Sequence, residues 1–173
     1  MRWLALFLAL LPLPLWANPV TPGAVEFAYG SFCSMEPTSE VVAEDTIAGT
    51  ISNYSERPEF IWSGTTVPAV LGLSFGVHVK VALPLEGPVR FHVAHPPMGP
   101  EGTTEQSWIG SLSADDLLYI GFSFDHDYER VTGPWTLSAR SGDILIYEIT
   151  FDVVDPKNLV AITMACGGEA LLS

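Results

Sequence analysis

Four side chains with metal-ligating or stacking chemistry lie in or beside one proline- and glycine-rich stretch. His92 precedes the stretch, His95 and Met98 lie within it, and Trp108 follows it. Imidazole and thioether groups beside an aromatic ring suit a soft metal or a small ligand. These four are therefore candidate ligand-binding residues. Their spacing matches no established metal motif, and neither a metal nor a cofactor is predicted.

His78 and His92 offer a second arrangement. Both are expected on the polar face of one β-hairpin, where they would be close to cross-strand neighbours, and His95 or a carboxylate could complete a metal site. Lys80 and Arg90 should lie on the same face, and their positive charges would oppose a cation. A pair of exposed polar strand residues is therefore the favoured interpretation.

Carboxylates gather between Asp125 and Glu129, in the segment Asp-His-Asp-Tyr-Glu. Calcium prefers oxygen ligands of this kind, but the further ligands and the glycine of an EF-hand loop are missing. A solvated loop between strands, with Asp125 or Glu129 bonded to the backbone, explains the segment better.

Local motifs for catalysis are missing from the sequence. It carries no G-x-S-x-G elbow, no H-E-x-x-H pair and no phosphate-binding glycine loop. No catalytic residue is predicted, and the chain is interpreted as a non-enzyme. Because a Ser-His-Asp triad can assemble from residues far apart in the sequence, a hydrolytic enzyme is kept as a third hypothesis.

The two cysteines, Cys33 and Cys166, are predicted to form one disulfide. Paired thiols are oxidised in exported proteins, and no C-x-x-C arrangement indicates a redox or metal site instead. The bridge would tie the two ends of the mature chain together. In the chain-entropy model, closing so long a loop stabilises the fold by about 5 kcal/mol, less any strain.

The N-terminus resembles a cleavable secretory leader. A basic residue, Arg2, precedes a short apolar run that Pro12 and Pro14 interrupt, and the most plausible cleavage site follows Ala17. The run is too short for a membrane span, which needs roughly twenty apolar residues. We expect a signal peptide over residues 1–17 and one domain over residues 18–173. The mature protein should be periplasmic or secreted and should not insert into the membrane.

The acidic composition narrows the range of partners. Lys and Arg together number 7 against 20 Asp and Glu, which gives a formal net charge of −13. Phosphate backbones and anionic lipid surfaces repel such a chain, so no nucleic-acid partner is expected. The charge is interpreted as a feature that favours solubility.

Alternating apolar and polar residues predict an all-β fold. The clearest strand spans residues 73–83, and it is expected to pair with residues 89–93 as an antiparallel hairpin. Residues 34–57 and the proline-rich stretch 95–106 are expected to be irregular. Further strands are expected at 25–29, 59–62, 118–124, 135–140, 144–154 and 159–166. About seven to nine such strands predict an antiparallel β-sandwich of the immunoglobulin-like kind.

Three blocks of residues have an order and spacing that resemble one known family. The blocks are Thr65-Thr66-Val67-Pro68-Ala69 with Leu71-Gly72 and Phe75-Gly76; His95-Pro96-Pro97-Met98 with Pro100, Gly102-Thr103 and Trp108; and Tyr119, Phe122, Phe124-Asp125, Asp127, Glu129, Val131, Gly133-Pro134-Trp135-Thr136 and Phe151. Over residues 59–154 they are similar to the bacterial domain of unknown function family 3859. The resemblance implies an immunoglobulin-like sandwich, often exported, with no known activity. The segment after Asp155, with Cys166, looks like an addition.

The leading functional hypothesis is a non-enzymatic binding or accessory module of the cell envelope. Its partner would be an envelope protein, a peptide or a glycan, held by loops or by an exposed strand edge. The alternative is a periplasmic protein that binds a small ligand or a metal through His92, His95, Met98 and Trp108.

Overall fold

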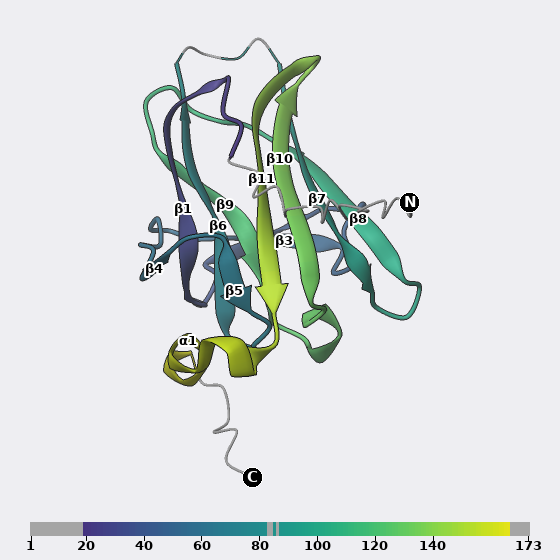
Figure 1. Cartoon of the computed structure of the whole chain (residues 1–173). Helices are drawn as coiled ribbons and strands as arrows, with labels where there is room; N and C mark the ends of the chain where they lie inside the picture. Colours follow the sequence, from purple (N-terminus) through teal and green to yellow (C-terminus); the bar gives the residue numbers. More distant parts are fainter. Residues whose placement is uncertain (1–18, 83–84, 86, 167–173) are drawn as a thin grey trace, which may run out of the picture.

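Two β-sheets form the body of the molecule in the computed structural model, which describes residues 19–82, 85 and 87–166 (Figure 1). The predicted leader, residues 1–17, lies outside the described residues. One sheet has the order β4 (Trp62–Ser63), β1 (Ala24–Cys33), β6 (Leu73–Val81), β9 (Leu118–Ser123). The other has the order β5 (Thr66–Pro68), β11 (Ile144–Val154), β10 (Gly133–Ser141), β7 (Val89–Met98), β8 (Thr103–Gly110). The predicted β-sandwich is confirmed, and of its sheet pairings in the described residues only β5 with β11 is parallel.

The inner faces of the two sheets enclose one aromatic-rich core. Val77, Val79 and Val81 of β6 and Val89 of β7 are all at most 1% exposed, as their alternation predicts. Trp135 is fully buried and packs edge-on to Phe75, with ring centroids 5.8 Å apart. Its indole N–H donates to the carbonyl of Val131 at 3.0 Å, so the polar edge of this core residue is satisfied.

The predicted hairpin between residues 73–83 and 89–93 is wrong. β6 pairs with β1 and β9, whereas β7 pairs with β10 and β8 in the opposite sheet. Both strands carry a strongly apolar face. When the strands belong to opposite sheets, these faces pack against each other and bury more apolar surface than they would as neighbours in one sheet. The connection also contains Pro84 and Pro88, which do not suit a tight hairpin turn.

The outer face of β6 is covered as well. His78 lies on this face, as predicted, but it is only 5% exposed because Pro58 and Phe60 cover it. Ser74 on the same face is 0% exposed, and its hydroxyl bonds to those of Ser34 and Ser123. His78 Nε2 lies 2.8 Å from the carbonyl oxygen of Pro58, and its ring stacks on Phe60 at 4.1 Å. The expected strand at 59–62 is reduced to the two residues of β4.

Most of the predicted irregular stretch 95–106 is strand. β7 runs to Met98, and a register shift between Ala94 and Met98 accommodates the consecutive prolines that a regular strand could not hold. Only residues 99–102 form the turn, with Gly99 and Gly102 at φ +70° and +66°. Both glycines occupy the left-handed region that L side chains rarely adopt.

The strands expected at 135–140 and 144–154 are confirmed as β10 and β11, which pair as an antiparallel hairpin. Strict alternation in β11 would place Leu145 on the same buried face as Tyr147, but Leu145 is half-buried, whereas Ile146 is fully buried. The pairing register shifts between Ala139 and Arg140, which lets both Ile146 and Tyr147 reach the core.

Two segments lie outside the sheets. Residues 34–57, expected to be irregular, contain the hairpin β2 (Ser39–Val42) and β3 (Thr50–Asn53), which forms a separate two-stranded sheet. The predicted C-terminal strand at 159–166 is wrong. The chain forms a 3₁₀ turn, η2 (Pro156–Leu159), and a short helix, α1 (Val160–Ala165).

The C-terminal turn begins where local chemistry favours it. The carboxylate of Asp155 accepts a hydrogen bond from the Lys157 amide, and Pro156 occupies the first helical position. Thr163 is buried and donates to the carbonyl of Pro156 at 3.0 Å. An apolar run this short fits a helix or a strand equally well by periodicity, which explains the wrong prediction.

The predicted disulfide between Cys33 and Cys166 is confirmed. It joins the end of β1 to the residue after α1, across a sequence separation of 133 and a Cα–Cα distance of 5.0 Å. We call residues 155–166 with this disulfide the C-terminal clasp; α1 lies at one end of the sandwich (Figure 1). Among the described residues, no helix is long and apolar enough to cross a bilayer.

Candidate functional site

The two sheets are joined differently on their two sides. On one side, β4 and β5 are the sheet edges, and only Gly64 and Thr65 separate them in sequence, so the chain passes directly between the sheets. On the other side, the edge strands are β8 and β9, joined by residues 111–117. A cleft of about 910 Å³ opens along this second side. We call it the β8–β9 cleft.

The β2–β3 hairpin lies over the cleft and is fastened mainly at its tip. Its base is closed by the Thr38 amide, which donates to the carbonyl of Asn53 at 2.8 Å. At the tip, the carbonyl of Asp45 accepts from the Ser107 amide of β8 at 3.1 Å. All four residues of β2 are exposed, so little apolar burial holds this strand in place.

A relay of polar groups makes the second attachment of the tip. The Ile47 amide donates to Oε1 of Gln106 at 2.8 Å, and Nε2 of Gln106 lies 3.2 Å from Nε2 of His95. Nδ1 of His95 lies 2.9 Å from the carbonyl oxygen of Pro96. Because a carbonyl only accepts, His95 must carry its proton on Nδ1 and accept at Nε2. Burial lowers the pKa of His95, which favours this neutral form.

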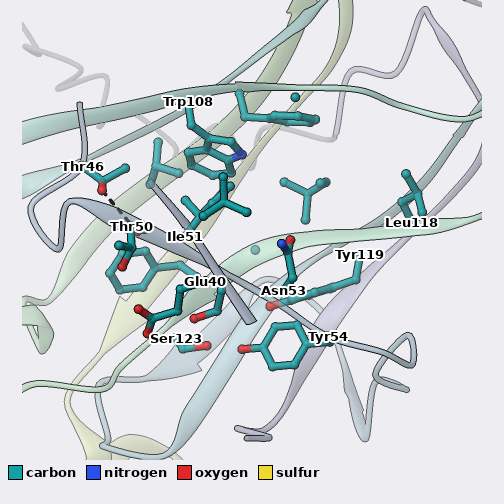
Figure 2. Close-up of a pocket in the computed structure, with 18 of the residues that line it drawn as sticks. Glu40, Thr46, Thr50, Ile51, Asn53, Tyr54, Trp108, Leu118, Tyr119 and Ser123 are labelled. Carbon is teal, nitrogen blue, oxygen red and sulfur yellow. Dashed lines mark hydrogen bonds between the residues drawn. The ribbon is translucent and has the colours of Figure 1, made fainter. Parts of the chain in front are cut away.

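Aromatic rings line both sides of the cleft. Trp108 of β8 stacks on Phe91 with centroids 5.5 Å apart, and Tyr54 meets Tyr119 of β9 edge-on at 6.2 Å. Figure 2 draws Trp108 at one side of the cleft and Tyr54 with Tyr119 at the other. Such rings offer flat apolar surface to a ligand at low entropic cost.

Tyr119 lies flat over its own strand because of a glycine. A side chain at Gly121 would meet the Tyr119 hydroxyl, which instead donates to the carbonyl of Phe75 at 3.2 Å. Burial raises the pKa of Tyr119 well above its usual value, so the phenol remains neutral. Gly121 thus positions one wall of the cleft.

Acidic groups dominate the charged lining. Among the described residues, the carboxylates of the lining are those of Glu40, Glu56, Asp125 and Glu129, against the guanidinium of Arg57. Arg57 is already engaged: it lies 3.2 Å from Glu59 and donates to the carbonyl of Leu117 at 3.3 Å. The cleft therefore presents a negative field to a ligand.

The carboxylate segment 125–129 has the backbone-bonding role that the sequence favoured. Glu129 ends the 3₁₀ turn η1 (Asp127–Glu129), and its Oε2 accepts from the amides of Asp125 and His126, both at 2.7 Å. Burial raises the pKa of Glu129, although these two amide bonds act in the opposite direction. Burial also raises the pKa of Asp125.

The four predicted ligand-binding residues do not share one surface. His92 points to the outer face of its sheet, where Nε2 lies 3.5 Å from Glu105. His95 and Met98 are buried at 6% and 3% exposure, and of the four only Trp108 lines the cleft. The pair of His78 and His92 is separated because the two strands belong to different sheets.

No metal-holding arrangement is found among the described residues: no three or more His, Cys, Asp or Glu side chains are grouped for one. The hydroxyls near the cleft bond to each other, with Ser123 Oγ 2.6 Å from Ser74 Oγ and Ser74 Oγ 2.8 Å from Ser34 Oγ. No hydrogen bond between a hydroxyl and a histidine is found in the part of the chain that the structure describes.

Sequence reasoning missed most of the cleft. Glu40, Ile51 and Tyr54 all fell in the stretch 34–57, which has no strong alternation. One usable signal was the strand 118–124, whose Tyr119, Gly121 and Ser123 break the apolar pattern on one face.

A comparison with family models finds one family that covers most of the chain. The family model described as "Domain of unknown function (DUF3859)" matches residues 23–153, which include the hairpin, the cleft and Cys33. The match begins well before residue 59, where the predicted resemblance began, and it ends before η2, α1 and Cys166. Cys33 therefore lies inside the family segment, whereas it was expected outside.

A solved structure supports the observed fold. An immunoglobulin-like protein from Pseudomonas aeruginosa matches with a TM-score of 0.53 and 23% identity, over 81% of this chain and 99% of that one. At this identity the likeness shows the immunoglobulin-like fold alone. No curated protein matches the chain.

Proposed function

The chain belongs to the DUF3859 family, and we propose that this member is a non-enzymatic binding module of the cell envelope that holds its partner in the β8–β9 cleft. One observation carries the proposal. The sandwich is left open along one side, and a hairpin whose first strand, β2, is fully exposed crosses the opening. A large concave surface with aromatic and polar lining is the usual form of a binding site.

The chemistry of the cleft favours binding over catalysis. Glu129 is occupied by two backbone amides, and the Ser123 hydroxyl is paired with Ser74. A serine nucleophile needs a base within hydrogen-bond reach, and the hydrogen bonds of the described residues give the Ser123 hydroxyl only that of Ser74. Aromatic rings on both sides of the cleft instead suit a ligand that is held by contact and not transformed.

Export is supported by the covalent link between Cys33 and Cys166. Stable disulfides form in oxidising compartments and are rare in the cytosol. The basic and apolar pattern of residues 1–17 agrees with this route. Fractionation of cells that produce the whole chain should recover the protein in the envelope or medium, with Asn18 as its first residue. A cytosolic protein that retains Met1 would contradict export.

The cleft itself is tested by site-specific photo-crosslinking in producing cells. A crosslinking amino acid at Ile109, which lines the cleft and is 54% exposed, is expected to give a discrete adduct. The matched control is Ile144, which is 62% exposed and does not line the cleft. Equal adducts at both positions, or none at Ile109, would reject the cleft as the binding site. An adduct of only a few hundred daltons would favour the small-ligand alternative.

A further inference from the structure

The edge of β9 that faces away from β6 has backbone groups that a ligand could pair with. Within the described residues, β9 pairs only with β6. The Phe124 amide donates to the carbonyl of Leu73 at 2.9 Å, and Phe122 pairs with Phe75 in the same register. Bonding alternates along an antiparallel strand, so the amides and carbonyls of Tyr119, Gly121 and Ser123 face away from β6, toward the cleft.

This edge lacks the usual protection against added strands. Natural sheet edges are blocked by Lys, by Pro, by a bulge or by a covering element that takes up the backbone groups. Residues 118–123 contain neither Lys nor Pro, and their register with β6 is continuous. The β2–β3 hairpin covers the cleft, but its tip bonds to β8, and in the described part of the chain no backbone hydrogen bond joins it to β9.

The charges around this edge favour a positively charged ligand. Glu40 and Glu56 are exposed, and Asp125 lies just beyond the end of β9. The net charge of the chain is −13, and the one guanidinium of the lining is already engaged by Glu59 and Leu117. An acidic groove attracts cationic side chains and repels anionic ones.

The aromatic rings suit the same side chains. Tyr54 and Trp108 line the same cleft as the carboxylates, so they offer apolar surface to the aliphatic stems of Lys or Arg. Such stems pack on apolar surface while the charged head remains in water, and the head gains further from the ring face.

We propose that the ligand is an extended, lysine- or arginine-bearing segment of a partner protein, which adds as a strand to the free edge of β9. This proposal rests on the proposed function, because it names the occupant of the same cleft. Main-chain hydrogen bonds to Tyr119, Gly121 and Ser123 give the affinity, and the carboxylates give the specificity for Lys or Arg side chains.

Three synthetic peptides test the proposal on the oxidised mature protein. The first alternates lysine and threonine over eight residues, the second has the same sequence with N-methyl groups on three consecutive central residues, and the third has glutamate in place of lysine. Binding is measured by fluorescence anisotropy at two salt concentrations. N-methylation removes edge bonds and keeps the charge, so we expect the second peptide to bind at least about tenfold more weakly than the first.

The glutamate peptide should show no binding, and the lysine peptide should slow amide exchange at Tyr119, Gly121 and Ser123 by NMR. Equal binding of the methylated peptide would show that charge alone acts and would overturn the strand addition. Absence of binding by the lysine peptide, or protection elsewhere only, would overturn the proposal too. If the peptides fail but a probe at Ile109 still crosslinks a partner such as a glycan, the cleft remains the binding site. Only the proposed ligand, a cationic protein segment, would then be rejected.

A matched pair of variants tests the role of the carboxylates. Glu40→Gln with Glu56→Gln removes two charges from the cleft, and Asp143→Asn with Asp152→Asn removes two exposed charges elsewhere. All four side chains are exposed, so neither variant should disturb folding. We expect about three- to tenfold weaker binding of the lysine peptide to the first variant and little change for the second. Equal effects would show that only the net charge matters, which contradicts recognition in the cleft.

Discussion

The C-terminal clasp and the β2–β3 hairpin are both appended to the same sandwich, and they are fastened in opposite ways. The clasp is held by a covalent bond and by the buried Thr163. The hairpin is held at its tip by two hydrogen bonds and by the packing of Ile47 against the core, and it exposes the whole of β2. One end of the sandwich is thus closed by a covalent link. The cleft is covered instead by a hairpin that is attached only through non-covalent contacts in the described residues.

The largest expected effect comes from removal of the clasp's covalent bond. Cys33→Ala with Cys166→Ala should lower the free energy of unfolding by about 5 kcal/mol, because the bridge spans a separation of 133 residues. Urea denaturation followed by circular dichroism measures the loss. Reduction of the native protein is the control and should give the same loss, and the sandwich spectrum should persist without urea. Two reactive thiols in the purified native protein would contradict the clasp.

The next effect concerns the hairpin tip. Gln106→Ala removes the partner of both the Ile47 amide and His95, and it should cost about 1–2 kcal/mol of global stability. Amide exchange at Ile47 should accelerate much more than exchange in the core. Thr163→Ala is the matched control, because it removes one buried hydrogen bond from the clasp. If both variants changed exchange at Ile47 equally, the two attachments would not be independent.

A smaller effect should follow from pH through the same relay. Burial lowers the pKa of His95, while the bond to Pro96 opposes the shift and His92 adds to it. The neutral ring is therefore favoured by folding, and its contribution to stability is complete above the unfolded pKa of about 6.5. The contribution is lost as pH falls from there through the lower folded pKa, because a proton on Nε2 would face the Gln106 amide.

We therefore expect exchange at Ile47, corrected for its intrinsic pH dependence, to rise on acidification below about pH 6.5. His95→Gln should abolish this rise. A rise of equal size in that variant would assign the pH response to groups other than His95.

The smallest effect is expected on the outer surface of the hairpin. Val42 is 74% exposed, so Val42→Thr should change the free energy of unfolding by less than about 0.5 kcal/mol. Ile162→Val in the clasp is the comparison, because Ile162 packs against the core, and it should cost about 1 kcal/mol. A loss at Val42 as large as that at Ile162 would show that the hairpin is held more firmly than its contacts indicate.

The sequence predicted the strands with a buried face better than it predicted their neighbours. The alternation in β6 and β7 identified the inward valines correctly, because every second side chain of a strand points to the same face. The same pattern cannot say whether two apolar faces lie side by side or opposite each other. The wrong hairpin, and with it the pairing of His78 and His92, came from that ambiguity.

The cleft was harder to predict than the core because its residues do not share a periodic pattern. Gln106 is a polar side chain that is buried by its partners, and Tyr119 lies flat only because Gly121 leaves room for its ring. β2 and β3 are exposed or half-exposed, so no apolar alternation marks them in the sequence. Trp108 was identified from its chemistry, but its companions were chosen from the neighbouring sequence and not from the opposite sheet edge.

The disulfide turns most of this chain into a covalent ring. The ring runs from Cys33 to Cys166 and includes the exposed hairpin over the cleft. A protease that cuts between Ala43 and Gly49 would divide the polypeptide into two pieces. The disulfide would still join these pieces, because Cys33 lies in one and Cys166 in the other. Such a nick would interrupt the hairpin over the cleft without releasing a fragment, and two bands would separate on a gel only after the disulfide is reduced.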